Sequence, residues 1–116
     1  MSTLGNGLKS EGFEGLLYST VISGLKDVMG TSGLVATKYH LKLDERNFDV
    51  NKFHDGLNNM FHVGSGAIEN VILQLLYNDL GAPFKERGGY EFPQYVELAR
   101  KIYLEKVKRN KRAETE

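Results

Sequence analysis

The chain has 116 residues, which is enough for one hydrophobic core and too few for two typical domains. Fifteen basic residues balance fifteen acidic ones, so no global field attracts nucleic acid or an anionic membrane. Cysteine is absent, which excludes disulfides, thiolate nucleophiles and sulfur-ligated metal sites. With 41% hydrophobic and 26% charged residues, the composition is typical of an ordinary globular domain.

Three segments are predicted along the chain. The first residues are small, polar and rich in glycine, and they predict a flexible leader over residues 1–9. They lack a basic stretch followed by an apolar one, and no run approaches the roughly 20 apolar residues that span a bilayer. We therefore expect neither secretion nor membrane insertion, and we expect a cytoplasmic protein. A single helical domain over residues 10–110 and a charged tail over 111–116 complete the division.

Apolar residues recur at intervals of three and four from about Ser10 to Met29 and predict a first helix. Gly24 weakens this helix, and we interpret it as a point of close approach to another helix. The glycines and hydroxyl residues of 30–33 predict a break. A short second helix is expected over Leu34–Leu43, although the alternation at its end also fits a strand. The apolar stripe of the first helix is Phe13, Leu16, Leu17, Val21, Leu25 and Val28.

The second half of the chain contains the most regular helical pattern. Asp49 or Asn51 is expected to cap a third helix that ends near Phe61. A wide apolar stripe predicts a fourth helix at about 66–80, with Gly81 as its terminal glycine. A loop is expected over Ala82–Phe92, and Pro93 fits the first turn of a last helix that runs to about Arg109. The sequence thus predicts an all-α fold, a compact bundle of four to five helices with the fourth central.

The histidines and carboxylates offer little catalytic pattern. His54 and His62 share a helix face and His40 could approach them, but no pair has the usual three- or four-residue ligand spacing. We expect partly exposed histidines and no metal. Acid–base pairs would come from Glu45, Asp49, Asp55 and Glu69, and all four lie in positions typical of solvated faces. No serine has nucleophile-elbow surroundings. We therefore predict no catalytic residues, no cofactor and no enzymatic activity.

Two further segments are candidates for binding. Gly64, Ser65 and Gly66 precede the fourth helix, where free amides can hold an anion. We favour a structural turn there, in which Ser65 or Gly66 caps the helix. The segment Lys85–Phe92 mixes charge, glycine and aromatic residues in the way that exposed binding loops do. For this segment we favour a connector in which Tyr90 or Phe92 folds back over the core.

The end of the last helix is strongly basic and is the main candidate for a charged partner. Such a cluster can contact phosphates or acidic proteins. Basic residues are also common at helix C-termini, where they complement the helix dipole. We favour this helix-dipole explanation because the overall charge is balanced and the sequence has no pattern typical of a DNA-recognition helix. The residues are Lys101, Lys106, Lys108, Arg109, Lys111 and Arg112.

The order of elements resembles a small archaeal all-α family, the Nitrosopumilus output domain, over roughly residues 13–81. The residues that carry the resemblance are Tyr39-His40-Leu41, then Phe53-x-x-x-Leu57-x-x-x-Phe61, then Gly64-x-Gly66-Ala67-x-x-x-x-Val71-Ile72-Leu73-x-x-Leu76-Tyr77-x-x-Leu80-Gly81. The resemblance implies a helical module that occurs alone or attached to signalling receivers, and it assigns no catalytic residue. The chain from Ala82 onward lies outside it.

We predict a non-catalytic interaction or signalling-output module that acts through contact with a protein partner or through self-association. The alternative is a small nucleic-acid-binding protein that uses the basic last helix. A metal- or phosphate-dependent enzyme at the Gly64–Gly66 turn and the histidines is a third, less favoured class.

Overall fold

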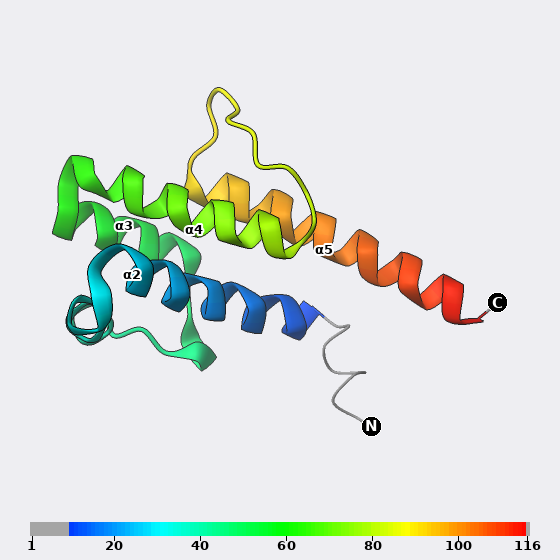
Figure 1. Ribbon diagram of the computed structural model, residues 1–116, viewed down its shortest axis with the longest axis horizontal. Coiled ribbons are helices and arrows are strands. Elements are labelled where there is room, and N and C mark those ends of the chain that lie inside the picture. The colour runs from blue at the N-terminus through cyan, green and yellow to red at the C-terminus, as the bar shows by residue number, and fades with distance from the viewer. Residues whose placement is uncertain (1–9, 116) are drawn as a thin grey trace.

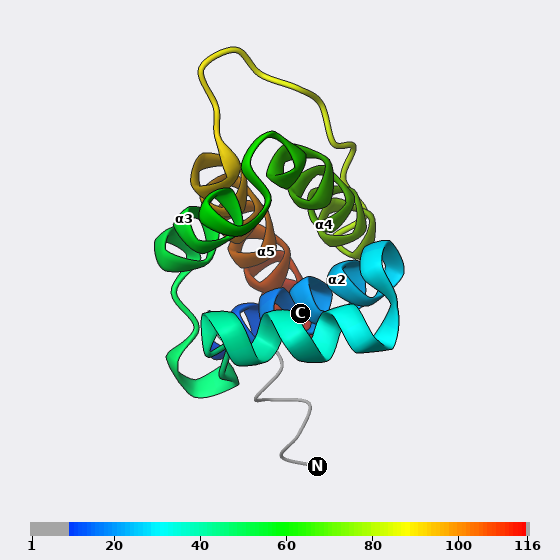
Figure 2. The same ribbon diagram turned by 90° about the vertical axis from the view of Figure 1, so that its left-hand side faces the viewer.

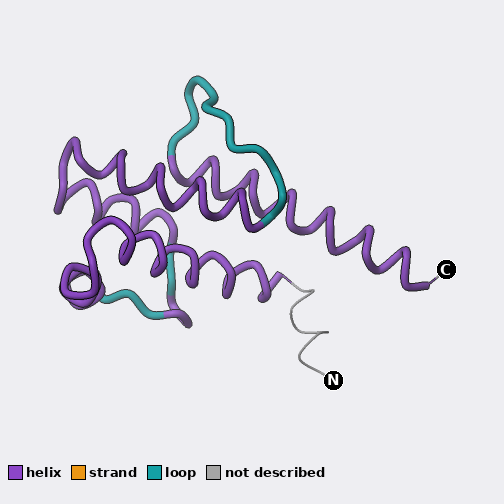
Figure 3. Tube along the Cα trace, in the orientation of Figure 1, coloured by secondary structure: helices purple, strands orange, loops and turns teal. Residues whose placement is uncertain are grey.

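The computed structural model describes the backbone of residues 10–115 and the side chains of residues 12–110, so the leader predicted over 1–9 lies outside the described residues. The described chain consists of α-helices, two short 3-10 helices and connecting loops, and no strand occurs within it (Figure 1, Figure 3). The prediction of a compact all-α fold is confirmed. Within the described chain, no helix has the length and apolar character needed to cross a membrane.

The first element, α2 (Ser10–Leu41), bends sharply at Gly30. Gly30 has φ 76° and ψ 177°, a backbone conformation that is essentially restricted to glycine. After the bend the chain crosses the lower side of the bundle in Figure 2. The expected division into four to five separate helices is therefore wrong here, because the first two predicted helices form one kinked element. The preference for helix over strand in Leu34–Leu43 is confirmed up to Leu41.

The next two helices are antiparallel and joined by a tight connection. A 3-10 turn, Glu45–Asn47, leads to α3 (Val50–Phe61), and a second 3-10 turn, His62–Gly64, leads to α4 (Ser65–Asp79). The predicted cap of α3 is confirmed at Asp49, whose Oδ1 accepts from the Lys52 amide at 3.0 Å. The predicted cap of α4 is wrong. Ser65 is the first residue of α4, and Gly64 occupies the N-cap position without a side-chain capping hydrogen bond.

The last helix, α5 (Phe92–Thr115), follows a long loop over residues 80–91. Gly81 ends α4 with φ 70°, as predicted. Pro93 lies in the first turn of α5, also as predicted, and the helix continues beyond Arg109 into the segment predicted as a charged tail. Its C-terminal half projects past the other helices (Figure 1).

The core lies between α2, α4 and α5, with α3 covering one side (Figure 2). α4 contacts α2, α3 and α5, which fits its predicted central place, but α5 also contacts all three of its neighbours. A Cβ built on Gly24 would lie 2.6 Å from Ile72 Cγ1, so the predicted close approach is confirmed between α2 and α4. Val28, assigned to the apolar stripe of the first helix, is instead 45% exposed, whereas the neighbouring Met29 packs against the core.

Candidate functional site

A cleft of about 520 Å³ opens between α3, α4 and the loop that precedes α5. His54 from α3 and Glu69 from α4 form its inner end, and the loop supplies its rim. Acidic side chains outnumber basic ones in this lining. The acidic residues are Glu69, Glu86 and Glu91, and the basic ones are His54 and Arg87. Aromatic rings make up much of the remaining wall, at Phe84, Tyr90, Phe92 and Tyr95.

Aromatic contacts hold both ends of the loop against the bundle. At the entry, the Phe84 ring packs between those of Tyr77 and Tyr95, with centroids 5.4 and 5.1 Å away. The buried Tyr77 hydroxyl donates to the Tyr95 carbonyl at 2.7 Å, which ties α4 to α5. Burial raises the pKa of Tyr77 to about 12, so this hydroxyl stays protonated and remains a donor. At the exit, Phe92 is 2% exposed and packs on Phe53.

The middle of the loop is more exposed, but it is also anchored. The Tyr95 hydroxyl accepts from the Arg87 amide at 2.6 Å. The Tyr90 ring lies 5.2 Å from that of Tyr95, and the Arg87 guanidinium lies 5.8 Å from the Tyr90 centroid. The expectation that Tyr90 or Phe92 folds back over the core is confirmed for Phe92. Tyr90 remains 39% exposed at the cleft rim.

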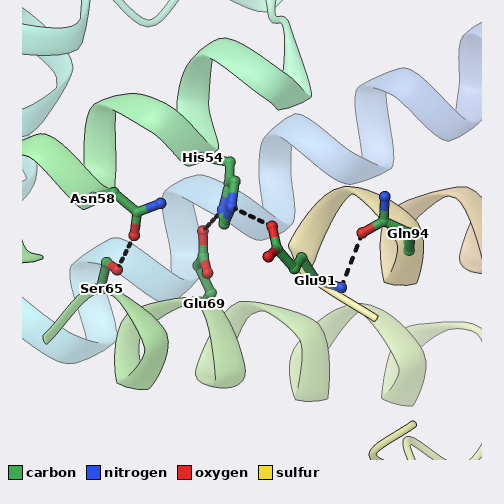
Figure 4. Close-up of polar contacts among 6 residues, drawn as sticks. All are labelled: His54, Asn58, Ser65, Glu69, Glu91 and Gln94. Atoms are coloured by element: carbon green, nitrogen blue, oxygen red, sulfur yellow. Dashed lines mark hydrogen bonds and ion pairs between the residues drawn. The ribbon is translucent and has the colours of Figure 1, made fainter. Parts of the chain in front are cut away.

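His54 lies between two carboxylates that come from different elements (Figure 4). Its Nδ1 is 2.5 Å from Glu69 Oε2, and its Nε2 is 3.3 Å from Glu91 Oε1. Both ring nitrogens can donate only when the imidazole is protonated, so this geometry favours the imidazolium form. The ring also stacks on Phe92, with an interplanar angle of 13°. His54 therefore links α3, α4 and the start of α5.

Both burial and neighbouring charges shift the pKa values of His54 and Glu69. Burial lowers the pKa of His54, but the hydrogen bonds and charges of Glu69 and Glu91 outweigh it, so the pKa is raised above 6.5. Burial raises the pKa of Glu69 above 4.5; His54 opposes this shift and the negative charge of Glu91 adds to it. The cluster thus holds protons more strongly than its isolated groups would.

The prediction that Glu69 occupies a solvated face is wrong. Glu69 is 8% exposed and pairs with His54. The signal was present in the sequence, because Ser65, Glu69, Ile72 and Leu76 follow one another at helical spacings of four, three and four. A polar residue on such a stripe needs a buried partner. Ser65 has such a partner as well, since its hydroxyl donates to Asn58 Oδ1 near the turn that joins α3 and α4 (Figure 4).

The structure separates the three histidines. His40 and His62 are exposed and do not line the cleft, so only His54 belongs to the site. The two nitrogens of His54 point to different carboxylates rather than to one common point. No group of three metal-ligating side chains was found among the residues that the structure describes.

The other predicted binding residues are divided between two regions. Gly66 lines the cleft, whereas Gly64 ends the preceding 3-10 turn and Ser65 is the buried first residue of α4. The basic residues all lie on α5, and those with described side chains do not line the cleft, although Lys101 shares a small hollow with Tyr90. Lys101, Lys108 and Arg109 are exposed and Lys106 is half-buried. Lys111 and Arg112 are on the same helix, but their side chains lie outside the described part of the structure.

Comparison of the chain with protein-family models, with curated proteins and with solved structures finds no significant match. The function of the cleft must therefore be argued from its own geometry.

Proposed function

We propose that this protein is a non-catalytic interaction module whose cleft recognises a basic segment of a protein partner. The observation that carries the proposal is the lining of the cleft. It combines the exposed carboxylates of Glu86 and Glu91 with the partly exposed Tyr90 and the ring of Phe84. Carboxylates and aromatic faces together favour the guanidinium of arginine or the ammonium of lysine. The contact between Arg87 and Tyr90 is an internal example of this pairing.

The geometry of the polar residues supports binding rather than catalysis. Both nitrogens of His54 face carboxylates, which leaves neither free to exchange a proton with a substrate. The Ser65 hydroxyl donates to Asn58 and not to His54, so it lacks the adjacent base that activates a nucleophile.

Amide NMR of the whole chain during titration with a synthetic arginine-rich peptide tests the proposal. We expect shifts at Glu69, at the loop 84–91 and at Tyr95, and none with a peptide in which glutamate replaces arginine. Glu86→Gln and Glu91→Gln should each weaken binding several-fold, because each removes a rim charge. Glu45→Gln is the matched control, since Glu45 is exposed and lies outside the cleft. Equal affinity of the two peptides, or shifts outside the cleft, would contradict the proposal.

The resemblance to the Nitrosopumilus output domain extends this proposal. It makes the module a cytoplasmic, signalling-output protein of archaeal type, in which partner contact transmits the signal. Self-association is a second form of the same proposal. Light scattering coupled to size exclusion distinguishes the two forms, because self-association raises the measured mass of the pure protein.

A second candidate function rests on the projection of α5. Lys101, Lys108 and Arg109 are exposed on a helix whose end extends beyond the other helices (Figure 1). Contacts with nucleic-acid phosphates would use these residues and weaken as salt increases. A gel shift with random duplex DNA at two salt concentrations tests this candidate. Loss of a salt-sensitive shift in the double variant Lys108→Glu/Arg109→Glu supports it, and no shift in the natural protein at low salt rejects it.

A further inference from the structure

Exposed apolar side chains are concentrated on α2. Among the described residues, the large exposed hydrophobic side chains are those of Val28, Val35, Tyr39, Val63 and Tyr90, and three of these belong to α2. Val35 is 60% exposed and Tyr39 is 85% exposed. They lie four residues apart, so they share one helix face.

The orientation of this segment is fixed by its opposite side. Leu34 and Thr37 are buried and Leu41 is half-buried, so they face the bundle. The outer α2 face, which we define as Ser32, Val35, Ala36 and Tyr39, is exposed throughout. In Figure 2 this part of α2 crosses the bottom of the bundle, and no other helix lies below it.

The charged side chains of residues 28–43, Lys38 and Lys42, are both basic, and Lys42 also lines a hollow with Asp44 and Asp49. Residues 28–43 contain Lys38, His40 and Lys42 and no aspartate or glutamate. Each of these three side chains is exposed. Lys38 and His40 come directly before and after Tyr39, so they lie on opposite flanks of the apolar face. The result is a narrow apolar face with a basic border.

We propose that the outer α2 face docks an acidic amphipathic helix of a protein partner. The apolar side of such a helix would cover Val35 and Tyr39, and its carboxylates would pair with Lys38 and Lys42. A second copy of this face is a poor occupant, because two basic borders repel each other. A membrane surface fits less well, because the larger apolar side chains, Leu34 and Leu41, face the bundle. Tyrosine is instead enriched in protein interfaces.

This surface is separate from the cleft. Its expected partner is acidic, whereas the partner expected at the cleft is basic. The outer α2 face has a basic border, whereas the cleft has an acidic lining. An acidic peptide and an arginine-rich peptide therefore test the two proposals separately, and either proposal can fail without the other.

The test is a titration of the full chain with a synthetic amphipathic helix that has leucine on one face and glutamate along its borders, followed by amide NMR. We expect shifts confined to residues 31–42, with the affinity reduced about tenfold by Tyr39→Ala and several-fold by Lys38→Glu. Tyr90→Ala is the matched control, because Tyr90 is also an exposed tyrosine but lies at the cleft. This variant should bind the peptide as the natural protein does.

Several outcomes would overturn the docking proposal. They are absence of peptide binding, equal binding of a peptide with lysine in place of glutamate, and an affinity unchanged by Tyr39→Ala. Binding to phosphatidylserine vesicles without binding to the peptide would identify a membrane surface instead. Circular dichroism of each variant checks folding, and we expect no change, because Tyr39 and Lys38 are exposed.

Discussion

His54 contacts Glu69, Glu91 and Phe92, and its contacts with the two carboxylates depend on its protonation state. Loss of the proton leaves two carboxylates, Glu69 and Glu91, on either side of a neutral ring. One of the two ring nitrogens then presents a lone pair to an oxygen, which removes a hydrogen bond and adds repulsion. The link between α3, α4 and the start of α5 weakens accordingly.

This protonation makes stability depend on pH. The folded-state pKa of His54 is raised above 6.5, so its contribution to the free energy of unfolding is fully present below 6.5 and is lost as the pH rises through the folded value. The raised pKa of Glu69 has the same sign at lower pH, since stability falls as the pH rises from 4.5. We therefore predict that urea denaturation shows a lower free energy of unfolding at about pH 9 than at about pH 6.

Replacement of His54 isolates its share of this effect. His54→Gln should flatten the loss of stability above pH 6.5, because glutamine does not titrate. His40→Gln, at an exposed histidine without a carboxylate contact in the described structure, should keep the natural pH dependence. If the free energy of unfolding of His54→Gln kept the natural pH dependence, a group other than His54 would be responsible for it.

At the scale of the elements, α2 and α4 approach each other closely at Gly24. An added Cβ would lie 2.6 Å from Ile72 Cγ1 and 3.3 Å from the Ile72 Cα, so both the side chain and the helix backbone must move. We predict that Gly24→Ala lowers the free energy of unfolding by about 1–3 kcal/mol, despite the higher helix propensity of alanine. Chemical denaturation measures this change.

Gly66 provides the matched control for Gly24. It also lies in a helix, and a Cβ there meets nothing within 4 Å. Gly66→Ala should therefore stabilise the protein by up to about 1 kcal/mol through helix propensity alone. Equal effects of the two substitutions would mean that the helices separate easily, contrary to the packing that we describe.

Most helix positions could be predicted from the sequence because they depend on local signals. The Asp49 cap, the terminal Gly81 and the early Pro93 act within one turn of the chain. The bend at Gly30 was located correctly, but its outcome was not, since a single glycine can redirect a helix without a separating loop. The exposure of Val28 and Tyr39 could not be predicted from periodicity.

The cleft could not be predicted, because its parts come together only after folding. His54, Glu69 and Glu91 are distant in sequence, and of the three only Glu69 lies on an apolar stripe that indicates a buried partner. The mixed loop 85–92 was recognised as a binding candidate, but its link to His54 depends on the packing of Phe92 against α3. Buried position, rather than residue type, distinguishes Glu69 from the other carboxylates considered.

At the scale of the whole molecule, one core joins all the helices. Side chains from α2, α3, α4 and α5 belong to a single buried cluster, and α4 contacts each of the other three helices. A core shared in this way has no internal boundary at which one part can unfold alone. The predicted single domain therefore has a thermodynamic consequence that can be measured.

We predict one cooperative unfolding transition, with coincident denaturation curves from far-UV circular dichroism and from tyrosine fluorescence. Leu76→Ala should shift both curves together and lower the free energy of unfolding by about 2–5 kcal/mol, because Leu76 of α4 is fully buried. Val35→Ala, at a 60% exposed position, should change it by less than about 0.5 kcal/mol. Two separate transitions would mean that α3 and the loop form a unit that unfolds independently. In that case the cleft would open without loss of the core between α2, α4 and α5, and partner binding would be coupled to local rather than to global unfolding.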